Sequence, residues 1–436
     1  MSIFSILASA TSGMRANQTA MSVISNNVAN VSTKGYSRQR VDLAASGPYN
    51  AAAFNGQLGT GVTIEGVSRI TDQYLEARIQ KEQGKADSWA IQMELLDGIE
   101  LGLDSLDLPT RLNEFWDAWH NFSVNPTMGS SVYEIQQQGE ALVGAMQSAG
   151  QVLTDMENQI NETISSQIAQ ANTLSEQIAK LNTEIKRSVK IGQNPNTFLD
   201  QRDVLVRELA GITGADVTYH DDATVSVTLS ITDASGNSQQ LSLVDGSNFE
   251  AIPDGAEVES FNGSLYGLQK IRDNELQDFK TGLDELAVSL VTEVNKLHNP
   301  TADPGKIDFF DPAVTGVADL ALSDEVKADE TQIGANTTST EEKEALGTDI
   351  YNLGTKFAKN ISAYFEKLGT AVKVAETQNE YEENMMAELE NLRASVSGVS
   401  LEEEVANMFM YQRAYQASAK LLSAVDEMLE AIINMV

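Results

Sequence analysis

Cysteine is absent from this chain of 436 residues, and histidine occurs only three times. Without cysteine, the chain can form no disulfide framework, thiolate nucleophile or cysteine metal site. The histidines, His120, His220 and His298, stand far apart and outside any HExxH-like ligand spacing. Phosphate-binding glycine loops and the GxSxG nucleophile turn are missing too. We therefore predict no enzyme, no cofactor and no metal site.

Basic residues are also scarce. The chain has 29 basic and 63 acidic side chains, which gives a formal net charge of −34. Because phosphate groups bind to basic surfaces, this balance argues against nucleic acid or an anionic membrane as a partner. The chain also lacks a run of about 18 apolar residues and a basic segment followed by an apolar one at its start. We expect neither a membrane span nor a signal peptide.

Helical spacing of apolar residues dominates what remains. It predicts helices over about 2–30, 72–106, 109–125, 130–187, 198–213, 268–297 and 346–396, and a last helix from about 400 to 436. Residues 150–187 alone would form a rod of roughly 57 Å at 1.5 Å per residue. Rods of this length are typical of bundles and coiled coils rather than of compact enzymes.

Three stretches depart from helical spacing. The glycine-rich residues 41–70 favour irregular or β-hairpin structure, and residues 214–261 alternate apolar and polar side chains, as strands do. Residues 299–343, with three prolines and an acidic run, predict a loop or a partly ordered excursion. The fold class is therefore mainly α with a small β insert (α+β). We expect a terminal helical domain (1–45 and 398–436), a long-helix bundle (46–213 and 262–397, irregular or β near 46–70) and a β-rich outer domain (214–261).

Apolar residues at both chain ends recur in steps of three and four, the spacing of a heptad seam. We expect the two ends to pair as a coiled-coil stem, and an intramolecular pair would be the simplest outcome. Small or polar seam members (Ala10, Asn17 and Ser418) weaken such a pair, and the apolar strips are too wide for it, so further subunits are favoured as partners. The predicted assembly residues are Leu7, Met14, Met21, Ile24, Val28, Met408, Tyr411, Tyr415, Leu422, Val425, Leu429 and Ile432.

The polar groups that stand out have simple structural interpretations. The run Glu402-Glu403-Glu404 fits the first turn of a helix, where carboxylates complement the dipole. Ser400 would be the N-cap, with Glu403 closing a capping box. We interpret His220 as part of a solvated turn with two aspartates, and His120 as a packed or partly exposed helix residue.

Two motifs at the chain ends carry a family resemblance. The head SNNVANVSTKGYSRQ (25–39) and the tail SGVSLEEEVAN (397–407) with YQRAYQASA (411–419) resemble the terminal motifs of the flagellar axial proteins, which build rod, hook and hook–filament junction. Three interior stretches, FLDQRDVL (198–205), GSLYGL (263–268) and DFF (308–310), resemble the junction members. The resemblance covers the chain except about 214–261 and 311–345. An outer domain that often follows the DFF segment is mostly missing here.

The resemblance implies a structural protein of the bacterial flagellum. It would leave the cell through the flagellar type III apparatus and form a ring with copies of itself. Its neighbours would be hook protein and hook-associated protein 3, and a cytoplasmic export chaperone would bind the C-terminal helix. We assign chaperone contacts to Leu422, Val425, Leu429 and Ile432, and the turn from terminal helix to outer body to Asn26, Asn27, Asn30, Gly35 and Tyr36. Residues 1–31 and 400–436 should be disordered until they assemble.

Two alternatives remain at this stage. The chain could be another axial protein, such as hook protein or hook-associated protein 3, although the long-helix middle speaks against hook protein. The 214–261 insert could display an enzymatic or sugar-binding module. Some fifty residues without a His/Cys cluster make a poor active site, so we disfavour this second alternative.

Overall fold

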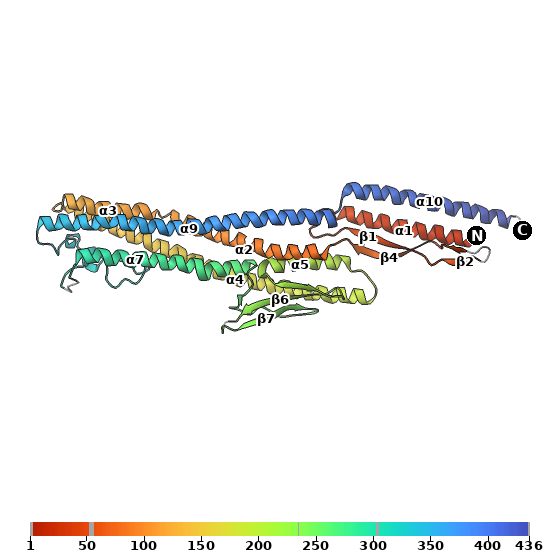
Figure 1. The fold of residues 1–436 in the computed structure, drawn as a ribbon, viewed down its shortest axis with the longest axis horizontal. Helices are drawn as coiled ribbons and strands as arrows, with labels where there is room; N and C mark the ends of the chain where they lie inside the picture. The colour runs from red at the N-terminus through yellow and green to blue at the C-terminus, as the bar shows by residue number, and fades with distance from the viewer. Residues whose placement is uncertain (1–2, 52–55, 234, 302–304, 435–436) are drawn as a thin grey trace. The chain divides into compact units, whose positions relative to one another are not determined.

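A computed structural model describes residues 3–51, 56–233, 235–301 and 305–434, and it is mainly helical with small sheets (Figure 1). The predicted class is therefore confirmed, while residue 2 and residues 435–436 of the predicted terminal helices lie outside the described residues. The helices are α1 (Ile3–Ala29), α2 (Gln73–Asp104), α3 (Leu108–Val124), α4 (Gly129–Lys190), α5 (Asn196–Thr213), α6 (Ser264–Lys270), α7 (Leu276–His298), α8 (Asp324–Ala328), α9 (Thr340–Ser397) and α10 (Leu401–Ile433). A π-helical segment, Ile271–Glu275, joins α6 to α7, and Glu330–Gln332 forms a 3₁₀ turn.

The strands lie in two of the three stretches where helical spacing is lost. Strand β1 (Gln39–Ala45) pairs antiparallel with β4 (Val62–Arg69), and β2 (Tyr49–Ala51) pairs with β3 (Gly56–Leu58). The insert forms a sheet of β5 (Asp216–Tyr219), β6 (Val225–Thr232), β7 (Ser238–Asp245) and β8 (Asn248–Phe249) in that order, and β9 (Glu257–Val258) also pairs with β6. Every second residue of β6 is buried, which confirms the predicted alternation.

Two compact units make up the chain. The first contains residues 1–85, 169–263 and 383–436, and the second contains residues 86–168 and 264–382. The first unit therefore holds both terminal helices and the β insert. The three-part division derived from the sequence stays a prediction.

An aromatic cluster forms the core of one end of the second unit. Phe115, Trp116, Trp119 and Phe122 are buried on one face of α3, as their spacing predicts. The ring centroid of Trp119 lies 5.3 Å from that of Phe309. Phe309 belongs to the stretch predicted as a loop or partly ordered excursion, and this stretch is more ordered than we predicted. Several of its apolar residues are buried in the fold: Phe309, Phe310, Leu320, Leu322, Val326 and Ile333.

Each of the three histidines contacts neighbouring protein groups, and the exposed His220 has its Nε2 2.7 Å from the hydroxyl of Ser226. His298 is buried in the second unit, where its Nδ1–H donates to the carbonyl of Ile307 (2.8 Å) and its Nε2 accepts from the amide of Gly334 (3.1 Å). Burial lowers the pKa of His298, which favours this neutral tautomer. His120 lies against the ring of Tyr351, with 4.8 Å between centroids. Through its two hydrogen bonds, His298 at the end of α7 thus holds the segments around Ile307 and Gly334 against that helix.

Candidate assembly site

The terminal helices α1 and α10 lie side by side within the first unit (Figure 1). Small residues line the most buried face of α1, where Ala10, Ala16 and Ala20 are all buried. A Cβ on Gly13 would lie 3.3 Å from the hydroxyl of Ser418, so the absence of a side chain on Gly13 allows α10 to come close. The small residues that seemed to weaken the seam are therefore part of its packing.

The predicted assembly residues have graded exposure. Ile24 and Val425 are buried, whereas Ile432 is 48 % exposed. The others are half-buried: Leu7, Met14, Met21, Val28, Met408, Tyr411, Tyr415, Leu422 and Leu429. Their role in contacts between subunits stays a prediction.

Asn27 is the centre of the polar contacts at the end of α1. It is 1 % exposed, and its side-chain amide bonds the backbone of Gln39 in both directions, at 2.9 Å to the carbonyl and 3.0 Å from the amide. The hydroxyl of Tyr36 donates to Asn27 Oδ1 at 2.8 Å. Burial, with the nearby acids Asp200 and Glu404, raises the pKa of Tyr36 to about 12. The hydroxyl therefore remains a donor, and the loop after α1 is held against the helix.

The same asparagine reaches the start of α10. Asn27 Nδ2 donates to Glu404 Oε2 at 3.1 Å, and Arg38 Nε donates to Glu404 Oε1 at 2.7 Å. Arg38 also bonds Glu403 at 2.8 Å, and its backbone amide donates to the carbonyl of Ser397 at 2.9 Å. Glu404 is 1 % exposed, so this is a buried carboxylate with its charge paired. The head motif and the tail motif therefore lock each other in place.

A second buried acid connects the loop after α1 to α5. Asp200 accepts from the amide of Ser37 at 3.3 Å and pairs with Arg69 at 3.0 Å, and Arg69 also pairs with Asp203 at 2.7 Å. Burial raises the pKa of Asp200, and the Arg69 guanidinium opposes that rise. The FLDQRD stretch on α5 thus contacts the head motif through the hydrogen bond between Asp200 and Ser37.

The predicted turn residues serve different purposes. Gly35 has a φ of +80°, and a Cβ there would lie 2.1 Å from a methyl group of Val204, so only glycine fits. Asn30 Nδ2 bonds the backbone carbonyl and the side-chain oxygen of Asn26, both at 2.9 Å. Both also bond to the turn: Asn26 Nδ2 donates to the Tyr36 hydroxyl at 3.4 Å, and Asn30 Oδ1 accepts from the Thr33 hydroxyl at 3.2 Å.

Sequence reasoning identified the N-cap of α10 but not the pairing of Arg38 with Glu404. Ser400 is the N-cap of α10, as predicted, because its hydroxyl accepts from the amide of Glu403. The run Glu402-Glu403-Glu404 was interpreted only as a helix start, yet Glu404 is buried. Arg38 was part of the head motif but was given no role. The signal was present: an arginine in one motif and a carboxylate run in the other can form a pair when the two ends meet.

One side of α10 stays apolar and uncovered. Met410, Leu421, Met428 and Ile432 share one flank of the helix and are 54 %, 54 %, 46 % and 48 % exposed. Exposed apolar strips of this kind mark interaction surfaces. Within the described residues, no helix is long and apolar enough to cross a membrane, and no group of three potential metal ligands occurs among them.

Three models of flagellar protein families match this chain. The model of the flagellar hook-associated protein FlgK helical domain matches residues 96–308. Models of the flagella basal body rod protein and of the C-terminal region of the flagellar basal body rod FlgEFG protein match residues 7–36 and 393–435. The two shorter matches include the motifs that meet at Asn27 and Glu404.

Individual relatives match over nearly their whole length. Flagellar hook-associated protein 1 of Bacillus subtilis is 28 % identical over 99 % of this chain and 98 % of its own. Its counterpart in Escherichia coli is 24 % identical over 99 % of both. A solved structure of the flagellar hook junction protein FlgK from Burkholderia pseudomallei is 20 % identical, with a TM-score of 0.42 over 51 % of this chain and 43 % of that one. From head to tail, the chain is therefore similar to proteins of the bacterial flagellum, and over nearly its whole length to flagellar hook-associated protein 1.

Proposed function

We propose that this chain is a structural protein of the ring that joins the flagellar hook to the filament, and that it assembles through α1 and α10. One observation carries the proposal. The head and tail motifs use their polar groups to join α1 to α10 inside one subunit, while the flank of α10 keeps an exposed apolar strip. The apolar side chains on this flank are thus exposed in the single subunit and form a surface that a neighbouring protein can cover.

The neighbours would be copies of the chain in the same ring, hook protein on one side and hook-associated protein 3 on the other. The half-buried seam residues, such as Met21 and Leu422, are covered partly by the α1–α10 pair and partly by these neighbours. An apolar strip that stays uncovered until assembly also needs masking before export. While α10 is still unpaired, a cytoplasmic chaperone bound over Leu422, Val425, Leu429 and Ile432 would mask its apolar residues, and the flagellar type III apparatus would export the chain.

Assembly would couple folding to binding. We expect residues 1–31 and 400–436 to exchange between open and paired forms in the free subunit and to become fixed in the ring. Limited proteolysis of the free subunit should cut within these segments before it cuts α3 or α7. Full protection of both ends in the free subunit would contradict this part of the proposal.

A deletion strain tests the function directly. Cells without the chain should build complete hooks that carry no filament, and should release flagellin into the medium. The intact gene should restore filaments. Filaments of normal length in the deletion strain would refute the proposal, and the absence of hooks would point to the hook-protein alternative.

A further inference from the structure

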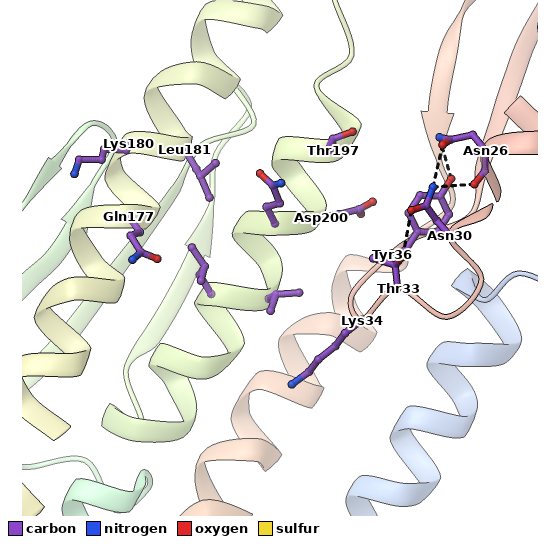
Figure 2. A pocket seen from close by; sticks show the side chains of 13 residues that line it. Asn26, Asn30, Thr33, Lys34, Tyr36, Gln177, Lys180, Leu181, Thr197 and Asp200 are labelled. Atoms are coloured by element: carbon purple, nitrogen blue, oxygen red, sulfur yellow. Dashed lines mark hydrogen bonds between the residues drawn. The ribbon is translucent and has the colours of Figure 1, made fainter. Parts of the chain in front are cut away.

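A groove of about 820 Å³ opens beside the loop that follows α1. Figure 2 shows its walls, with Gln177, Lys180 and Leu181 on α4, Thr197 and Asp200 on α5, and Lys34 and Tyr36 on the loop. All of these elements belong to the first unit. Leu181, Val204 and Leu205 give the groove an apolar floor, and its rim is polar.

Part of the head motif lines this groove and lies outside the contacts between Asn27, Arg38 and Glu404. Asn27 and Arg38 hold α1 to α10, but Thr33 and Lys34 are exposed on the groove rim. Among the described residues, no carboxylate lies within ion-pair distance of Lys34. Lys180 across the groove has only an exposed pair with Glu176 on its own helix, and such pairs contribute little. Lys34 therefore gives the rim an exposed positive charge without an ion pair, on a chain whose net charge is −34.

A surface of complementary character lies at the start of α10. Leu401, Val405 and Phe409 follow one another at four-residue steps and are 48 %, 46 % and 62 % exposed. Glu402 is exposed too, and it stands seven residues before Phe409, which places both on one face of the helix. This patch, Leu401, Glu402, Val405 and Phe409, spans roughly 12 Å at 1.5 Å per residue. It offers apolar side chains for the floor and a carboxylate for the rim.

We infer that the groove receives the α10 patch of a second copy of this chain, with Glu402 of that copy at the lysine rim and Phe409 on the apolar floor. The groove and the patch are different surfaces of one subunit. A contact between different surfaces is heterologous and propagates around a ring, whereas a contact between identical surfaces stops at a dimer. The inference rests on the proposed ring and identifies one contact within it.

A charge exchange tests the contact in cells. Lys34→Glu should lower the amount of chain bound to isolated hooks by at least tenfold, because it places two carboxylates together. Adding Glu402→Lys to Lys34→Glu should restore binding to within about threefold of the original chain, as expected for coupled partners. Arg187→Glu is the matched control, since Arg187 is an exposed cation on α4 outside the groove lining. Circular dichroism and thermal unfolding show whether each variant is folded.

Disulfide trapping gives a second, independent measurement. Because the natural chain has no cysteine, a variant with Gln177→Cys and Phe409→Cys should form a ladder of linked subunits on oxidation of assembled hooks. A variant with Gln177→Cys and Tyr351→Cys should not form that ladder. If the unaltered chain fails to bind hooks at all, both the proposed ring function and this contact are refuted. If it binds while Lys34→Glu behaves like Arg187→Glu, or no ladder forms, only this contact is refuted.

Discussion

Replacement of Glu404 by alanine should release the start of α10 from the end of α1. The Glu404 carboxylate is 1 % exposed and accepts from Arg38 Nε at 2.7 Å and from Asn27 Nδ2 at 3.1 Å. In the variant, Asn27 loses a buried acceptor, and Arg38 keeps only its bond to the exposed Glu403. The loss should therefore be felt in both motifs.

The magnitude follows from these contacts. Breaking a buried ion pair by removing one partner costs about 3–5 kcal/mol. Arg38 has a 20 % exposed side chain and retains its bond to Glu403, which places this case near the lower limit, at about 3 kcal/mol. Since each 1.4 kcal/mol corresponds to about a factor of ten, local opening should become about a hundredfold more frequent.

Hydrogen exchange measures this local opening. The amide of Gln39 donates to Asn27 Oδ1, and that of Arg38 donates to the carbonyl of Ser397, so both amides report on the network. Both should exchange about a hundredfold faster in Glu404→Ala. Glu402→Ala is the matched control, because Glu402 is exposed in the same helical turn.

The comparison between the two variants decides the outcome. Equal exchange rates in Glu404→Ala and Glu402→Ala would refute the conclusion that Glu404 holds the two motifs together. Faster exchange across the whole chain, rather than in the first unit alone, would show a general loss of folding instead of a local release.

Three further predictions follow from other parts of the chain. Leu429→Asp places a carboxylate in the half-buried seam, so it should abolish binding to hooks without changing the thermal unfolding of the second unit; normal filaments would contradict it. The pKa of His298 is lowered in the folded chain, so the unfolded chain binds a proton more readily than the folded one. The second unit should therefore lose stability as pH falls below about 6.5, the ordinary pKa of histidine. Thermal unfolding at about pH 7.5 and about pH 5.5 should show a smaller loss in His298→Gln than in the original chain. Gly263 has a φ of +93°, and a Cβ there would lie 2.5 Å from the backbone nitrogen of Gly214, so Gly263→Ala should cost at least about 2 kcal/mol in denaturant unfolding. Gly236→Ala, at a φ of +81° with open space around it, should cost about 1 kcal/mol; equal losses would show that backbone conformation alone matters.

Periodicity made most of the secondary structure predictable. The long helices follow from apolar residues at helical spacing, and strand β6 follows from alternation at Val225, Val227 and Leu229. The N-cap at Ser400 follows from local chemistry as well. The stretch 299–343 was harder to predict, because Phe309 and Leu322 become buried through contacts with distant helices rather than through any local period.

The sequence by itself determined the helical class, the matching stripes at the two ends and the two terminal motifs, because each is written in neighbouring residues. Only the tertiary structure decided which of three adjacent glutamates is buried. Glu402, Glu403 and Glu404 have nearly the same local surroundings, and Glu404 is selected because Asn27, 377 residues earlier, arrives beside it. Likewise, Gly35 must be glycine because Val204 on α5 occupies the space of its missing side chain. Contacts between segments so far apart depend on how the helices pack, and no local pattern encodes that.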